Sequence, residues 1–379
     1  LLLLLFLFDG CSINIDHKII NDNKIISLRD KIAQMIMIRI DGNFHNTEDW
    51  NKKHVESLVE DYNIGGLITY TGNIHGTFYN IESLQKISKT PMFISADYER
   101  GLGTFIDGTL FPFNMAVAAT GNPDYSYQQG KIISSEAKSV GVNMIFAPVL
   151  DINNNLNNPI INIRSYGDTP ETVIKYGIPF IKGIQEGGLI ACAKHYPGHG
   201  NTSTDSHTSL PIIDISSTEL YQNELVPFKK ACYSNVKSVM IGHIVIPSID
   251  ANYIPATFSE KITHNILRDE WNYQGLIITD ALEMGALTSK TWHGESAVRA
   301  IEGGADIVLL PLDSKEAIQS IKYAVDIGRI SIERINQSYD RIMAVKEDIG
   351  LFEKKENQSW KNVENNVKIS NNTKVASLI

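Results

Sequence analysis

Cysteine is scarce in this chain, with only three among 379 residues, at positions 11, 192 and 232. Three cysteines cannot build a disulfide framework, so a packed core must hold the fold together. Basic residues are also few, with 34 Lys and Arg against 43 Asp and Glu and a net charge of −9. This balance argues against a nucleic-acid partner, because phosphate binding needs a basic surface. No stretch reaches the roughly 18 consecutive apolar residues of a membrane-spanning helix.

The overall composition is that of a globular protein. Hydrophobic residues make up 43% of the chain and charged residues 20%, which excludes a disordered or fibrous protein. The length predicts one large domain or two ordinary ones.

The two ends differ from the rest of the chain. Residues 1–8 form an apolar run, and the following Asp9-Gly10-Cys11-Ser12 resembles a bacterial lipobox, although Phe8 and Asp9 depart from it. We therefore expect a signal or lipobox-like segment over 1–11, a linker over 12–26, and a secreted or periplasmic lipoprotein anchored through Cys11. A plain signal peptide and a buried helix are the alternatives. Residues 351–379 are expected to be a polar linker preceding a missing C-terminal domain.

Between these ends, short β-branched runs alternate with amphipathic helical patterns. The predicted strands are Met35–Arg39, Gly66–Tyr70, Met92–Ala96, Asn143–Ala147, Leu189–Lys194, Val239–His243, Leu276–Thr279 and Asp306–Leu310. Eight strands, each followed by a helix, predict an α/β fold, a (β/α)₈ TIM-type barrel forming a single catalytic domain over 27–350. A doubly wound open sheet is the alternative, but no glycine-rich turn follows the first strand.

Ionisable side chains stand where several predicted strands end. These residues are Asp97, Glu99, Asp151, Lys194, His195, His243 and Asp280. Because barrel enzymes carry their chemistry at the C-terminal ends of the strands, this pattern favours an active site there.

The segment from Lys194 to His207, KHYPGHGNTSTDSH, is the most informative. Its glycines and proline predict a bent loop. Asp205 and His207 stand two residues apart, so on an extended loop both side chains point to one side. The carboxylate would then orient the imidazole as a general acid/base. A solvated polar loop is the alternative for so short a pattern.

Lys-His-Tyr-Pro-Gly-His-Gly followed by Asp-Ser-His resembles the signature of the β-N-acetylhexosaminidases of glycoside hydrolase family 3. Further stretches resemble the family in the same order: 95–101, 111–116, 146–151, 162–167 and 278–282. The resemblance covers roughly residues 27–350 and implies a retaining exo-β-N-acetylglucosaminidase. Its substrates would be cell-wall fragments or chitooligosaccharides.

The resemblance also assigns roles. Asp280 would be the nucleophile that forms a covalent glycosyl-enzyme, which agrees with a carboxylate at a strand end. His207 would be the general acid/base and Asp205 its orienting partner. Substrate-binding roles would fall on Asp97, Arg164, Lys194 and His195, whereas Asp151 would hold the mouth together. The sequence departs from the family motif at Leu102 and Phe105, where basic residues are often found.

Several alternatives stay open. A phosphorylase or a β-glucosidase of the same family is possible, although glucose-specific relatives generally take their acid/base from a second domain. A non-catalytic sugar-binding lipoprotein has no need of Asp280 together with the histidine pair. A metal-dependent hydrolase could use His195, His199, Asp205, His207 and His243, but three of these histidines crowd one loop. We expect a carbohydrate substrate, no nucleic acid, no cofactor and no metal.

Overall fold

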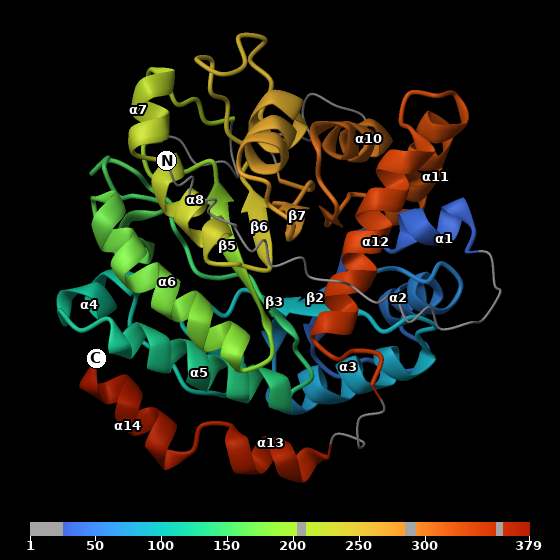
Figure 1. Ribbon diagram of the computed structural model, residues 1–379. Coiled ribbons are helices and arrows are strands. Elements are labelled where there is room, and N and C mark those ends of the chain that lie inside the picture. Colours follow the sequence, from blue (N-terminus) through green and yellow to red (C-terminus); the bar gives the residue numbers. More distant parts are fainter. Residues whose placement is uncertain (1–25, 203–209, 285–292, 354–358) are drawn as a thin grey trace, which may run out of the picture.

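The computed structural model describes residues 26–202, 210–284, 293–353 and 359–379. Eight parallel strands run in the order β7-β6-β5-β4-β3-β2-β1-β8. They are β1 (Ile36–Gly42), β2 (Gly66–Gly72), β3 (Phe93–Ala96), β4 (Met144–Ile145), β5 (Ile190–Tyr196), β6 (Ser238–Ile241), β7 (Leu276–Thr279) and β8 (Val308–Leu309). A parallel bridge between Ile278 and Ile307 joins the two ends of the sheet. The predicted (β/α)₈ barrel is confirmed (Figure 1).

All eight predicted strands are present, with shifted ends. β1 ends three residues later than predicted, whereas β4, predicted over Asn143–Ala147, spans only Met144–Ile145. Pro148, three residues beyond Ile145, has no N–H to donate, and pairing with β5 resumes there only as a single bridge between Val149 and Lys194. Short barrel strands of this kind leave long loops at the C-terminal end, where the predicted site residues lie.

Helices cover the outside of the barrel (Figure 1). They are α1 (Leu28–Ala33), α2 (Trp50–Glu60), α3 (Ile74–Ile87), α4 (Asn114–Ala119), α5 (Asp124–Ser139), α6 (Pro170–Glu186), α7 (Ser217–Gln222), α8 (Leu225–Tyr233), η4 (Lys261–Glu270), α10 (His293–Gly303), α11 (Ser314–Asp326) and α12 (Ile332–Asp348). Side chains of Asp49, Thr169 and Asp313 accept the free N–H groups at the starts of α2, α6 and α11. Such N-caps fix where each helix begins.

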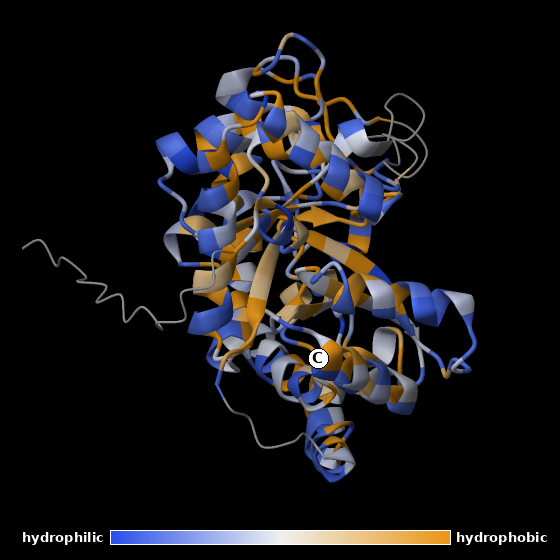
Figure 2. Cartoon of the chain, turned by 90° about the vertical axis from the view of Figure 1, so that its right-hand side faces the viewer, coloured by the Kyte–Doolittle hydropathy of each residue, from blue (hydrophilic) through white to orange (hydrophobic). Residues whose placement is uncertain are grey.

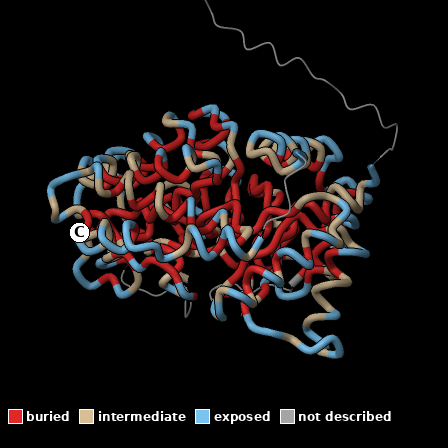
Figure 3. Tube along the Cα trace, turned by 90° about the horizontal axis from the view of Figure 1, so that it is seen from below, coloured by how far each residue is buried: buried red, intermediate tan, exposed pale blue. Residues whose placement is uncertain are grey.

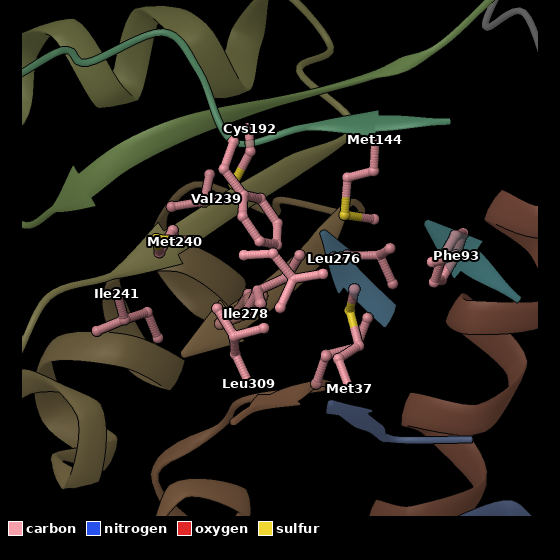
Figure 4. Packing of buried hydrophobic residues seen from close by; sticks show 14 of the residues in the cluster. Met37, Phe93, Met144, Cys192, Val239, Met240, Ile241, Leu276, Ile278 and Leu309 are labelled. Atoms are coloured by element: carbon pink, nitrogen blue, oxygen red, sulfur yellow. The ribbon is translucent and has the colours of Figure 1, made fainter. Parts of the chain in front are cut away.

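The core fills the barrel and the layer between strands and helices. In Figure 2 the strands are hydrophobic and are surrounded by helices whose outer faces are hydrophilic. Figure 3 shows that the buried residues lie at the centre of the molecule. Met37, Met144, Cys192, Leu276 and Ile278 are all buried, and Figure 4 shows their side chains gathered between the strands. Cys192 and Cys232 are free and buried, and burial raises the pKa of each thiol to about 12, as expected of packing residues.

The N-terminal end of the barrel contains the buried ionisable side chains of Asp306 and Lys346. Asp306, before β8, is fully buried and accepts hydrogen bonds from Arg268 at 2.6 Å and Arg341 at 3.2 Å. Lys346 of α12 is also fully buried, and its Nζ donates to Gln34 Oε1 at 2.7 Å and the carbonyl of Gly65 at 3.1 Å. These contacts fasten α12 to the strand starts.

Lys346 predicts a specific pH dependence of stability. Burial lowers its pKa to about 7, whereas an unfolded lysine titrates near about 10.4. Between these values the unfolded state binds more protons, so this group makes stability increase as the pH rises. Lys346→Met removes the buried amine, so we expect its free energy of unfolding to exceed that of the parent at pH 7. This difference should shrink by about 3 kcal/mol from pH 7 to pH 10. Urea denaturation at both pH values measures it.

Lys322→Met is the matched control, since Lys322 lies at the surface and pairs with Asp326 at 2.6 Å. Its effect should not change over the same pH interval. An identical pH slope for the parent and Lys346→Met would contradict the prediction.

Beyond residue 358 the structure differs from the expected linker. It contains α13 (Trp360–Asn366) and α14 (Ser370–Leu378), which lie along α5 (Figure 1). Trp360 stacks on His75 with ring centroids 3.7 Å apart, and Asn372 donates to buried Glu136 at 2.9 Å. The Asn-rich composition suggested a solvated linker, but the Trp360 indole and the Asn372 amide contact α3 and α5.

The predicted signal segment over 1–11 and the predicted linker over 12–26, except its last residue, lie outside the described residues. Within the described part of the chain, no helix has the length and apolar character needed to cross a membrane.

Candidate active site

The C-terminal ends of the strands bring five of the seven predicted site residues to one mouth. Asp97 follows β3, Lys194 and His195 belong to β5, and Asp280 follows β7. Arg164 ends the short helix η2 (Asn162–Arg164) in the loop after β4. The other two, Asp205 and His207, lie outside the described residues.

Lys194 is the centre of an ion-pair network. Its Nζ lies 2.8 Å from Asp97 Oδ1 and 2.7 Å from Glu99 Oε1, and its side chain is 3% exposed. Arg164 binds Glu99 through two nitrogens, at 2.6 Å and 3.0 Å. Two carboxylates and two cations from three different loops and strands are therefore locked together at the mouth.

The opposite charges in this network keep one another ionised. Although burial opposes its ionisation, Lys194 and Arg164 hold the pKa of Glu99 far below its usual range. Burial also opposes the charge on Lys194, but Asp97 and Glu99 raise its pKa above the usual value. The mouth thus presents fixed donors and acceptors, which suit the hydroxyl groups of a sugar ring.

A second buried group orients His195. The ring Nδ1 lies 2.7 Å from Asp151 Oδ2, and the same carboxylate accepts the backbone N–H of His195 at 3.2 Å and of His199 at 2.7 Å. Although burial opposes the ionisation of Asp151, His195 and His199 hold the pKa of this carboxyl below its usual value. Because the carboxylate can only accept, Nδ1 carries the proton and the ring orientation is fixed.

The loop after β5 is held by the loop after β4. Asn158 donates its side-chain amide to the carbonyls of His199 at 2.8 Å and Gly200 at 3.0 Å. Gly200 is required here, because a Cβ would lie 1.6 Å from the carbonyl oxygen of Ile152. The loop that the glycines and proline predicted to be bent thus packs its backbone against the neighbouring loop. It fixes the start of the segment that leads to Asp205 and His207.

Asp280 is poised as an ionised carboxylate. Its Oδ1 accepts the backbone N–H of Ala281 at 2.8 Å. Burial opposes its ionisation, but His243, His195, the Ala281 N–H and Lys194 hold the pKa of Asp280 below its usual value. An ionised carboxylate at the mouth of a barrel can act as a nucleophile.

His243 of the loop after β6 supports this arrangement. It is fully buried, with Nε2 at 2.9 Å from the carbonyl of Ala281 and Nδ1 at 2.6 Å from Thr257 Oγ1. Since a carbonyl only accepts, Nε2 donates. His243 thereby fixes the peptide unit that follows Asp280.

The sequence comparison decides the family. Residues 27–345 match the N-terminal domain of glycosyl hydrolase family 3. The chain belongs to glycosyl hydrolase family 3.

Relatives of this family-3 chain include named glycosidases. It is 30% identical over 326 residues to beta-hexosaminidase A of Pseudoalteromonas piscicida, covering 77% of this chain and 54% of that protein. The chain thus spans about half the length of that curated relative. A solved family-3 beta-N-acetylglucosaminidase from Paenibacillus sp. str. FPU-7 superposes with a TM-score of 0.84 at 33% identity, over 93% of this chain and 68% of that one. A beta-glucoside phosphorylase superposes with a TM-score of 0.86 at 26% identity, over 93% and 64%.

The departures from the family motif lie at the mouth. Leu102 is fully buried in the short helix η1 (Leu102–Thr104). Phe105 packs near Tyr70 and Tyr98, with ring centroids 6.4 Å from each. Where the family motif often has basic residues, this family-3 chain has apolar packing.

Three of the histidines that were considered as metal ligands form hydrogen bonds with protein groups. His195 binds Asp151, His199 Nδ1 lies 2.8 Å from Thr202 Oγ1, and His243 binds Thr257 and Ala281. In the part of the chain that the structure describes, no group of three or more His, Cys, Asp or Glu side chains could hold a metal ion.

The sequence reasoning assigned no role to two residues of this family-3 site. Glu99 joins Lys194 to Arg164, and its signal was the acidic motif directly after a strand. Asn158 holds the loop after β5. It stands among several asparagines, so no local pattern distinguished it.

Proposed function

We propose that the chain is a retaining exo-β-N-acetylglucosaminidase. Its substrates would be terminal β-linked N-acetylglucosamine residues of cell-wall fragments or chitooligosaccharides. The observation that carries the proposal is Asp280, an ionised carboxylate at the end of β7 beside the fixed donors and acceptors of the Lys194 network.

In the proposed mechanism, Asp280 attacks the anomeric carbon while His207 protonates the oxygen of the leaving group. The resulting covalent glycosyl-enzyme is hydrolysed when His207 takes a proton from the incoming water. Asp205 would orient His207. The roles of these last two residues rest on the sequence motif and the family.

The remaining substrate contacts follow from the geometry. Asp97, Lys194 and Arg164 would bind ring hydroxyls, because their polar atoms are held in place by the ion-pair network. His195, oriented by Asp151, would bind the sugar through its second ring nitrogen. The preference for N-acetylglucosamine over glucose rests on a histidine acid/base carried by the barrel itself, and on the relatives' names.

Phosphorolysis is the second candidate. The beta-glucoside phosphorylase of similar structure favours it. A histidine acid/base would also repel an incoming phosphate less than a carboxylate does. Phosphate would then replace water in the second step.

Turnover of 4-nitrophenyl glycosides tests the proposal. We expect the β-N-acetylglucosaminide to be cleaved at least about 100-fold faster than the β-glucoside, in the presence of chelator and without any effect of phosphate. Proton NMR should show the β-anomer as the first product. Faster turnover with phosphate and a sugar phosphate product would establish the phosphorylase instead. Binding of N-acetylglucosamine without turnover would indicate a sugar-binding protein.

Export and lipidation of Cys11 are also proposed, from the sequence pattern alone. Metabolic labelling with a palmitate analogue tests them, and Cys11→Ser should remove the label.

A further inference from the structure

Arg39 reaches the catalytic mouth from β1. It lies two residues after Met37, so both side chains point to the same face of the strand, and Figure 4 shows Met37 among the side chains between the strands. The Arg39 guanidinium pairs with Glu283 and lies 4.7 Å from the centre of the Tyr70 ring. Half of its side chain is exposed. The planar Arg39 guanidinium is thus held at the mouth, while part of the side chain stays accessible to a ligand.

Aromatic rings continue this surface. Tyr70 at the end of β2 meets Phe105 edge-on, with ring centroids 6.4 Å apart. We call Arg39, Tyr70, Phe105 and Glu283 the acceptor patch.

The acceptor patch adjoins the Asp280 carboxylate. Glu283 follows Asp280 by three residues. Burial and the nearby charges of Asp97 and Asp280 raise the pKa of Tyr70 to about 12, although Arg39 opposes the shift. A sugar whose anomeric carbon faces Asp280 would therefore have its leaving group close to this patch.

The chemistry of the patch suits a neutral sugar. Aromatic rings pack against the C–H faces of a pyranose, and an Arg–Glu pair offers donors and acceptors for its hydroxyl groups. Because the Arg39 and Glu283 charges cancel, the ligand need not be charged. The family motif often places basic residues in the loop after β3, whereas here Arg39 supplies a cation from β1.

A cavity of about 320 Å³ continues from Arg39 between α2 and α3. Its polar lining includes Asp41, His45, Lys52 and Asn80. This volume is at the lower end of ligand pockets, roughly 300–1,000 Å³. Nearby, Trp50 is 72% exposed and stacks on His54 with ring centroids 5.1 Å apart. This cavity, which Arg39 also lines, and the exposed ring extend the surface beyond a second sugar.

We propose that the acceptor patch binds the second sugar of a chitooligosaccharide and that the adjoining cavity binds the third. This inference rests on the proposed function. It makes Arg39 a residue that determines substrate length.

Calorimetry in the Asp280→Asn background tests the inference without hydrolysis. The ligands are N-acetylglucosamine, its β-1,4-linked dimer and its trimer. We expect Arg39→Ala to lower the ratio of dimer to monomer affinity about tenfold. Arg39→Lys should lower this ratio less, because lysine keeps the positive charge although it lacks the planar guanidinium group. Trp50→Ala should lower the ratio of trimer to dimer affinity.

Arg29→Ala is the matched control. The Arg29 guanidinium lies 4.6 Å from the Tyr62 ring, a similar contact, but on α1, which precedes the first strand. In the same background, its affinity ratios should equal those of the Asp280→Asn protein. If the Asp280→Asn protein binds the monomer and adding Arg39→Ala leaves the ratio of dimer to monomer affinity unchanged, the inference alone is wrong. If the Asp280→Asn protein binds none of the three sugars, the proposed function is wrong as well.

Discussion

Asp280→Asn is expected to lower turnover of the β-N-acetylglucosaminide by on the order of 10³-fold or more. The amide has nearly the shape of the carboxylate, and its oxygen can still accept the Ala281 N–H that now lies 2.8 Å from Oδ1. It is uncharged, however, and cannot form the glycosyl-enzyme. Kinetics of nitrophenol release and mass spectrometry with a slow fluorinated N-acetylglucosamine substrate measure the two effects. The covalent adduct should appear in the parent and be absent from the variant.

Asp326→Asn makes the same chemical change at the exposed end of α11, where Asp326 pairs with Lys322. Its turnover should match that of the parent. Azide should restore turnover to Asp280→Gly, since a small anion can enter the space of the lost carboxylate, and the product should then be the α-azide. Retention of full activity by a folded Asp280→Asn would refute the assignment of the nucleophile.

Lys194→Met is expected to lose both stability and activity. The ammonium is 3% exposed and neutralises Asp97 and Glu99, so its removal leaves two half-buried carboxylates with Arg164 as the remaining cation of the network. Breaking a buried ion pair from one side costs about 3 kcal/mol of unfolding free energy. Loss of a charged hydrogen bond to the sugar should lower kcat/KM by on the order of 10²-fold. Urea denaturation and kinetics with the β-N-acetylglucosaminide measure these two losses.

The double variant Lys194→Met with Glu99→Gln separates the two effects. It removes one uncompensated carboxylate and should recover part of the lost stability, while the sugar contact stays lost and kcat/KM stays low. Equal stability of the parent and Lys194→Met would show that the network does not hold the mouth together.

The strands were predictable because barrel strands are buried on both faces and read as short apolar runs. Their ends were less predictable, because the end of a strand depends on its neighbours. β4 is regularly paired only at Met144 and Ile145, although its apolar run continues to Ala147. The two C-terminal helices were missed because Trp360 and Asn372 find their partners on α3 and α5. Composition says nothing about such partners.

The predicted site residues were found through their position after strands and through motif order. Five of them lie at one mouth, as the convergence of barrel strands requires. Their contacts were not predictable. The Asp97–Lys194 pair spans 97 residues of sequence, and Arg164 and Glu99 are 65 residues apart. Neither distance follows from any local periodicity.

The sequence by itself determined the barrel, the family and the position of Asp280, because hydrophobic periodicity and motif order are local properties of the chain. Only the tertiary structure decided that Glu99 joins two cations and that Arg39 meets Glu283, 244 residues away. The physical reason is closure of the sheet. Pairing of β8 with β1, and the bridge from β7 toward β8, bring the loop after Asp280 beside the first strand. A contact made by closure depends on all eight strands at once.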